Sequence, residues 1–108
     1  MERIPLEAIP NQKLNVQLSG KTYNITINTR SGLSYVSLSI GDTPLVSGRI
    51  CLPNKRIELP HYLFNNGVLF FHCQDEETPF YQKFGVLHNL YYATNYEWLE
   101  LTGGGYGA

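Results

Sequence analysis

The chain has 108 residues, of which 43% are hydrophobic and only 16% are charged, and its net charge is −1. This length suits one domain with one core, and the composition excludes wholesale disorder. The near-neutral charge argues against a general nucleic-acid binder, and no apolar run approaches the ~18 residues needed to cross a bilayer.

The few charges are unevenly distributed. Residues 1–73 contain seven Lys and Arg residues and four Asp and Glu residues. Residues 74–108 contain one Lys and five Asp and Glu residues. Globular domains usually carry more charge, at about a quarter of their residues. Two interpretations stay open: the surface is covered by a partner, or Ser, Thr and Asn form the polar face of a free domain.

The first segment, residues 1–12, is predicted to be an extended arm. Pro5 and Pro10 cannot continue a helix and bias the residues before them toward extended conformations, and Ile4, Leu6 and Ile9 supply apolar side chains. Such an arm either lies along a neighbouring protein or folds back over its own domain. The start of the chain lacks the apolar run of a signal peptide, so synthesis in a cytoplasm is expected.

Residues 13–52 show the alternation of apolar and polar side chains that is typical of half-buried strands. Strands are expected over residues 13–19, 22–29, 33–40 and 44–52. Glycine-containing turns separate them, at Gly20, Gly32 and Gly41. Short strands at this spacing predict an antiparallel meander that closes into a small barrel or sandwich.

The second half is less regular. Residues 68–73 form a continuous apolar run, which predicts a central strand buried on both faces. A short strand at most is expected at residues 57–59, followed by a loop at 60–67 and an acidic loop at 74–79. Two further strands are expected at 86–92 and 96–101, and a flexible tail at 103–108. The prediction is therefore a single all-β domain over residues 13–102, between the arm and the tail.

Reactive side chains do not form a convincing catalytic or metal site. Cys73 with His72 or His88 as its base would be one candidate nucleophile. Neighbours on a strand point to opposite faces, however, and Cys73 continues the apolar run. His61, His72 and His88 lack a chelating spacing. We therefore expect no enzyme activity, no catalytic residue, no cofactor and no metal, and we expect Cys51 and Cys73 to be packed free thiols.

Aromatic residues are the strongest remaining signal, because eleven of the fourteen lie between Tyr62 and Trp98. Tyr and Trp are favoured at protein interfaces. A stacking platform for single-stranded nucleic acid would need interleaved Lys and Arg, and this half has only Lys83. The predicted interface therefore combines the arm with these aromatics: Ile4, Leu6, Ile9, Tyr81, Tyr91, Tyr92, Tyr96 and Trp98.

Several segments resemble the baseplate plug proteins of tailed phages. RIPL at residues 3–6, IPNQ at 9–12 and the strand LNVQL at 14–18 are similar to the start of that family. Residues 42–52 are similar to its middle and residues 85–92 to its end. Residues 103–108 lie outside that pattern.

The resemblance implies a small β-rich structural protein near the tail-tube axis, typically of a contractile tail, with no enzyme activity and no cofactor. The implied partners are other baseplate or tail proteins, namely the hub, tube or spike, and also a further copy of the chain. Neither nucleic-acid specificity nor a membrane is implied, and the implied location is the virion, after assembly in the host cytoplasm. The alternative is a small β-barrel module that binds a peptide, a carbohydrate or a host factor.

Overall fold

The structure is a computed structural model that describes residues 1–18, 20–57, 59 and 67–102. It confirms the small all-β fold, as two antiparallel sheets rather than a closed barrel. In chain order the elements are β1 (Glu2–Ile4), β2 (Gln12–Leu18), β3 (Lys21–Arg30), β4 (Leu33–Ile40), β5 (Thr43–Ile50), β6 (Gly67–Cys73), a 3₁₀ turn (Tyr81–Lys83), β7 (His88–Thr94) and α1 (Asn95–Thr102).

The larger sheet has the order β2-β3-β4-β5 and follows the sequence alternation closely. Its inward side chains sit opposite one another, as in the pair Ile27 and Val36, and both are buried. The turn between β3 and β4 places Ser31 at φ 51° and Gly32 at φ 78°. Two successive positive φ values give the tight hairpin turn that matches strand twist, so the chain reverses there without a register slip.

The smaller sheet has the order β1-β7-β6, and it corrects the expectation that residues 68–73 form a central strand. β6 is buried on both faces as expected, but it lies at the edge of its sheet. The segment before it covers that edge, because the N–H groups of Asn54 and Ile57 donate to the carbonyls of Phe71 and Leu69, each at 2.8 Å. Two carbonyls at this edge of β6 are therefore satisfied without a full strand beside it.

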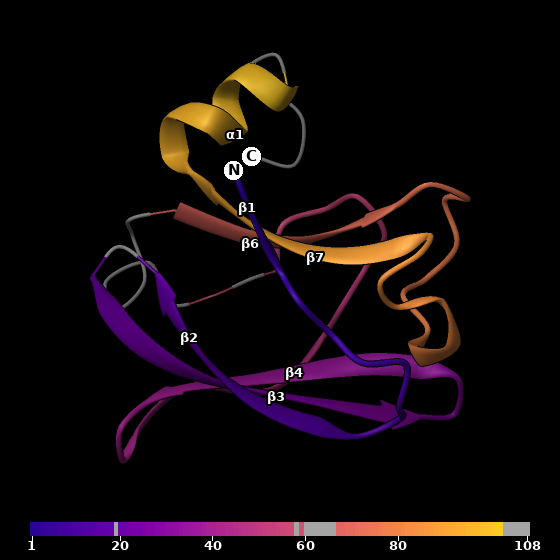
Figure 1. The fold of residues 1–108 in the computed structure, drawn as a ribbon, viewed down its shortest axis with the longest axis horizontal. Coiled ribbons are helices and arrows are strands. Elements are labelled where there is room, and N and C mark those ends of the chain that lie inside the picture. The colour runs from indigo at the N-terminus through magenta and orange to yellow at the C-terminus, as the bar shows by residue number, and fades with distance from the viewer. Residues whose placement is uncertain (19, 58, 60–66, 103–108) are drawn as a thin grey trace.

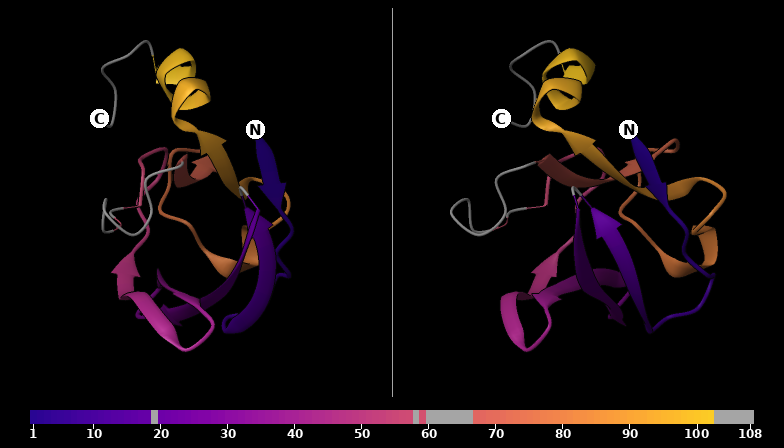
Figure 2. Two further views of the ribbon diagram at one scale, coloured as in Figure 1. Left: turned by 90° about the vertical axis from the view of Figure 1, so that its left-hand side faces the viewer. Right: turned by 60° about the vertical axis from the view of Figure 1, so that its left-hand side comes forward.

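The two sheets face one another across the main core (Figure 2). Leu69, Phe71 and Cys73 of β6 point into it, together with the inward residues of β3 and β4. A buried hydrogen bond of 2.7 Å, from the Ser34 hydroxyl to the Pro79 carbonyl, ties the larger sheet to the segment before the 3₁₀ turn.

The C-terminal element is a helix, so the expected strand at residues 96–101 is wrong. Thr94 and Glu97 form a capping box: the Thr94 N–H donates to Glu97 Oε1 at 2.9 Å, and the Glu97 N–H donates to Thr94 Oγ1 at 3.2 Å. This exchange satisfies backbone groups at the first turn and favours a helix. α1 forms a third layer outside the smaller sheet (Figure 1), where Trp98 packs on Phe70 with ring centroids 4.9 Å apart.

Two expected segments lie outside the described residues, wholly or in large part. They are the tail at 103–108 and the loop at 60–67, of which only Gly67 is described, as the first residue of β6. The expected strand at 57–59 is replaced, where the chain is described, by isolated bridges that join Pro53 and Arg56 to β6.

Candidate interaction surface

The arm lies mostly along its own domain. β1 pairs with β7 and places Ile4 opposite Leu90, and Ile4 is only 1% exposed within the main core. Leu6 is half-buried against that core, and Ile9 is exposed. Of the three arm residues, Ile9 is therefore the one whose side chain is freely available to a partner in this conformation.

The five predicted interface aromatics are divided between the interior and the surface. Tyr92 and Trp98 are buried, in the main core and under α1 respectively. Tyr81 and Tyr91 are half-buried, and Tyr91 stacks on Phe70 with centroids 5.8 Å apart. Only Tyr96 is largely exposed, at 71%.

The helix presents apolar side chains on several sides. Trp98 faces the sheet, whereas Tyr96, Leu99 and Leu101 are exposed. Four of the eight residues of α1 are apolar, and of these only Trp98 is buried. We call these three exposed side chains the helix surface; sequence reasoning missed Leu99 and Leu101, although the Thr94–Glu97 capping box signals the helix.

A shallow hollow of about 270 Å³ adjoins the helix surface. It is lined by Met1, Phe70, His72, Tyr91 and Leu101. The N-terminal ammonium of Met1 contacts Glu97 at its rim, and this contact lowers the pKa of the Glu97 carboxyl. The hollow and the helix surface together form a mainly apolar area that a side chain of another protein can enter.

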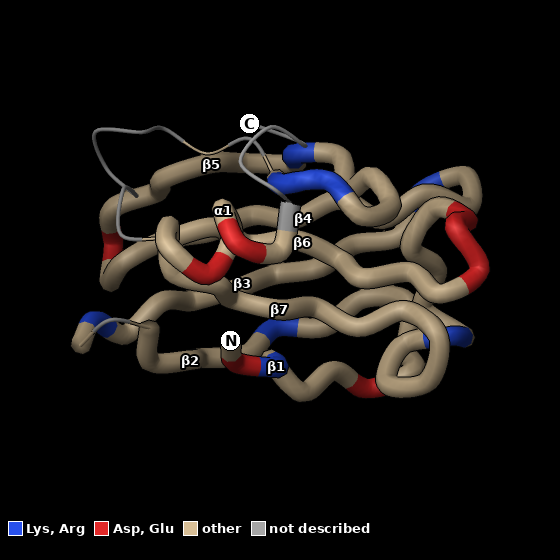
Figure 3. Tube along the Cα trace, turned by 90° about the horizontal axis from the view of Figure 1, so that it is seen from above, with Lys and Arg blue, Asp and Glu red and all other residues tan. Residues whose placement is uncertain are grey.

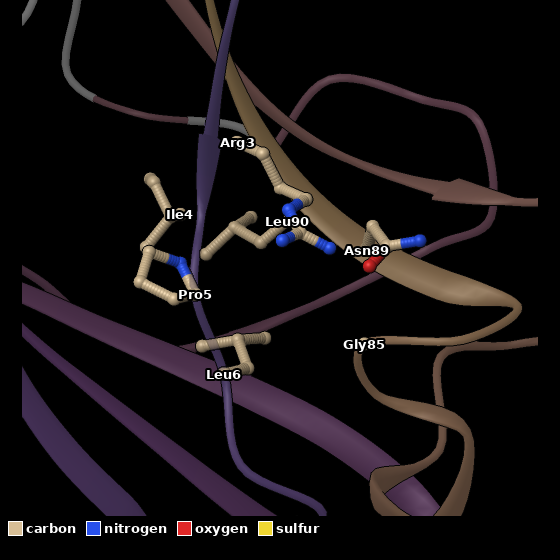
Figure 4. A pocket seen from close by; sticks show the side chains of 7 residues that line it. All are labelled: Arg3, Ile4, Pro5, Leu6, Gly85, Asn89 and Leu90. Atoms are coloured by element: carbon tan, nitrogen blue, oxygen red, sulfur yellow. The ribbon is translucent and has the colours of Figure 1, made fainter.

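A second hollow, of about 200 Å³, lies between the arm and β7 (Figure 4). Arg3 and Asn89 border it together with the apolar side chains of Ile4, Leu6 and Leu90. The Asn89 amide donates to the Val86 carbonyl at 3.2 Å, which fixes its orientation. Because Ile4 and Leu90 are almost completely buried, the exposed lining of the hollow is mainly polar, which suits a polar chain segment.

The acidic loop is braced by an internal network around Asp75. Asp75 accepts from Lys83 Nζ at 2.8 Å and lies 2.8 Å from His88 Nε2. The Lys83 bond, followed by the His88 bond, holds the pKa of Asp75 well below its ordinary range. Lys83 also contacts Glu77 at 2.8 Å, and these two carboxylates raise the pKa of Lys83, with Asp75 the stronger cause.

The network leaves His88 without a free nitrogen. Its Nδ1 accepts from the Phe80 N–H at 2.9 Å, its Nε2 faces Asp75, and its side chain is 1% exposed. Accepting at Nδ1 places the ring proton on Nε2 in the neutral form. His88 thus anchors the loop, and it is not available as a base toward an external substrate.

The cysteines occupy interior positions. Both Cys51 and Cys73 are free and buried, and burial raises the pKa of each thiol to about 12. Cys73 lies opposite His88 in the β6–β7 ladder, whereas His72, its neighbour along β6, is exposed. A thiolate is the reactive form of cysteine, so neither histidine forms an activated pair with Cys73.

Charged residues are sparse over the chain trace (Figure 3). α1 carries the acidic residues Glu97 and Glu100 and no basic residue. Among the described residues, no group of three or more His, Cys, Asp or Glu is arranged to hold a metal ion. The one α-helix of the described residues is too short to span a membrane.

Comparison with known proteins identifies a family for most of the chain. A protein-family model described as cyanophage baseplate Pam3 plug gp18 matches residues 1–95. No curated protein matches the chain. The matched region spans both sheets and ends at the first residue of α1, so the whole helix surface lies beyond it.

Proposed function

Because the chain belongs to the cyanophage baseplate plug family, we propose that it is a plug near the axis of the tail tube, held there by contacts with other tail proteins. Its role is structural: it closes or organises the baseplate end of the tail. Contact alone carries this function, without a chemical step.

The helix surface is the observation that supports this proposal most directly. Tyr96, Leu99 and Leu101 are 71%, 51% and 56% exposed on one short helix. Exposed apolar groups gathered in one place commonly mark a protein interface, and Tyr is among the residues enriched where binding energy concentrates. A partner that covers α1 would bury them and would also fill the adjacent hollow.

The charge of Glu100 indicates the chemistry of that partner. Glu100 flanks the helix surface and α1 carries no basic residue, whereas Glu97 already pairs with the N-terminal ammonium of Met1. A partner segment with an apolar side chain and a nearby Lys or Arg fits this arrangement, because complementary charge favours the correct partner and orientation. A segment of a hub, tube or spike protein is the expected occupant.

Substitutions of exposed residues test this assignment in phage particles. Phages carrying the double variant Tyr96→Ser and Leu99→Ser are purified, and the chain is quantified in the tails by mass spectrometry. Val86→Ser is the matched control, because Val86 is 68% exposed and lies outside α1. Exposed substitutions change stability by only about 0.5 kcal/mol each, so both variants should stay folded.

We expect the double variant to be depleted at least about tenfold in tails, which corresponds to about 1.4 kcal/mol of lost binding. The Val86 variant should be incorporated normally. Normal incorporation of the double variant would show that the helix surface is not the contact. Absence of the wild-type chain from purified tails would contradict the plug role itself.

A further inference from the structure

The outer edge of β2 differs from the other strand edges in the described part of the chain. β5 carries Pro44, which lacks an N–H, and Gly48 at φ 63°, and its register with β4 is shifted twice. The β6 edge accepts hydrogen bonds from Asn54 and Ile57, and β1 is only three residues long. β2 is seven residues long and pairs with β3 without a register shift, and none of the described strands lies on its other side.

The register of β2 shows which backbone groups this edge presents. Leu18 pairs with Lys21 and closes a two-residue hairpin loop. The two residues of such a closing pair hydrogen-bond to each other through their backbones, and so does every second pair along the antiparallel ladder. Lys13, Asn15 and Gln17 belong to the alternate pairs. Their N–H and C=O groups therefore point away from β3, toward a strand that would lie beside β2.

The inner face of β2 is also less covered than that of its neighbour. Leu14 and Val16 are half-buried, whereas Ile25 and Ile27 of β3 have no exposed surface. Both half-buried side chains pack on the margin of the main core. A strand beside β2 would extend the sheet and cover these two side chains.

We infer that a second copy of the chain pairs its β2 antiparallel to this β2, about a two-fold axis at Asn15. This inference goes beyond the plug role and does not depend on it. In this register Asn15 faces Asn15 of the second copy, and Lys13 faces Gln17 of the second copy. The outward-pointing N–H and C=O groups of Lys13, Asn15 and Gln17 in each strand are then all opposite a strand with which they can hydrogen-bond.

The side chains favour this register over the one centred on Lys13. Leu14 meets Val16 of the second copy on the inner face, so the half-buried apolar groups of both strands cover one another. A shift that placed Lys13 opposite Lys13 of the second copy would oppose like charges, which is destabilising. The two larger sheets join into one continuous sheet that passes through both copies.

Sedimentation equilibrium of the purified chain tests the pairing, with Asn15→Pro and Asn15→Ala compared with wild type. Proline is tolerated on an edge strand where its nitrogen faces outward, so Asn15→Pro should keep the β2–β3 ladder. It removes two hydrogen bonds across the axis, and we expect the dimer dissociation constant to rise roughly tenfold or more. Asn15→Ala keeps the N–H and should change this constant only slightly.

Disulfide trapping tests the register independently. Asn15→Cys places two thiols across the axis, and directly opposite Cα atoms of an antiparallel pair lie about 5.5 Å apart, within disulfide reach. Asn24→Cys is the matched control, because Asn24 pairs with Asn15 within the sheet, on β3. Mild oxidation should give covalent dimers of Asn15→Cys and far fewer of Asn24→Cys.

Two results would overturn the inference. One is equal trapping of Asn15→Cys and Asn24→Cys. The other is a wild-type chain that stays monomeric at millimolar concentration. If that monomeric chain still enters tails through the helix surface, the plug role stands and only the self-pairing is wrong.

Discussion

Replacement of Ile4 by Ala tests whether the arm belongs to the core of its own domain. Ile4 is 1% exposed, pairs with Leu90 through β1, and contacts the main core. Ile→Ala at a fully buried site costs about 2–5 kcal/mol, the lost burial plus the cavity left behind. A domain of this size has only about 5–15 kcal/mol of stability, so the loss is a large fraction of the total.

Urea denaturation followed by circular dichroism measures this effect. With a slope of about 1.5 kcal/mol per molar urea, the midpoint should fall by roughly 1–3 M. Ile9→Ala is the matched control, because Ile9 lies in the same arm and is 39% exposed; its midpoint should move by less than about 0.5 M. Equal small shifts for both variants would refute the assignment of the arm to this core.

Two further predictions concern titratable groups. Burial raises the pKa values of Cys51 and Cys73 to about 12. Both thiols should therefore react slowly with a disulfide reagent in the native protein and fast in urea. Rapid labelling of the native protein would contradict their interior position. The folded-state pKa of Asp75 lies below the ordinary 3.8, so its ionised form stabilises the fold above that pH and the stabilisation is lost as the pH falls further. The fall of the urea midpoint on acidification should therefore be smaller in Asp75→Asn than in wild type. Asp42→Asn, in an exposed turn, should show the same fall as wild type. An equal fall in all three proteins would contradict the role of the Lys83 contact.

The strands of the larger sheet were predictable from the sequence, because a half-buried strand must alternate its side chains. The expected strands at 22–29 and 33–40 correspond to Lys21–Arg30 and Leu33–Ile40. Turn residues with positive φ fix where each of these strands ends. The predicted bounds of β7 were less accurate, at 86–92 instead of the observed His88–Thr94. This strand is largely buried, so its apolar pattern is nearly continuous.

The helix was missed because residues 96–101 alternate between apolar and acidic types except at the adjacent pair Trp98 and Leu99. Tyr96, Trp98, Leu99 and Leu101 fit a short strand almost as well as two helical turns. The side-chain exchange between Thr94 and Glu97 favours the helix, and a Thr three residues before a Glu is its sequence signal. That signal predicts where the helix begins, whereas the exposure of Leu99 and Leu101 follows from the docking of α1 through Trp98.

The burial of individual aromatic residues depends on tertiary contacts that composition cannot show. The number of aromatics suggested more side chains than one core could hold. The structure instead has two apolar clusters, one between the sheets and one under α1. Trp98 fills the second cluster and Tyr92 the first, which leaves Tyr96 as the exposed member of that set.

An electron cryomicroscopy map of intact tails tests the central claim most directly. The account predicts density for the two-sheet fold at the baseplate near the axis of the tail tube, with α1 covered by a neighbouring protein. A map in which this fold is absent from the baseplate, although the chain is produced in infected cells, would contradict the account.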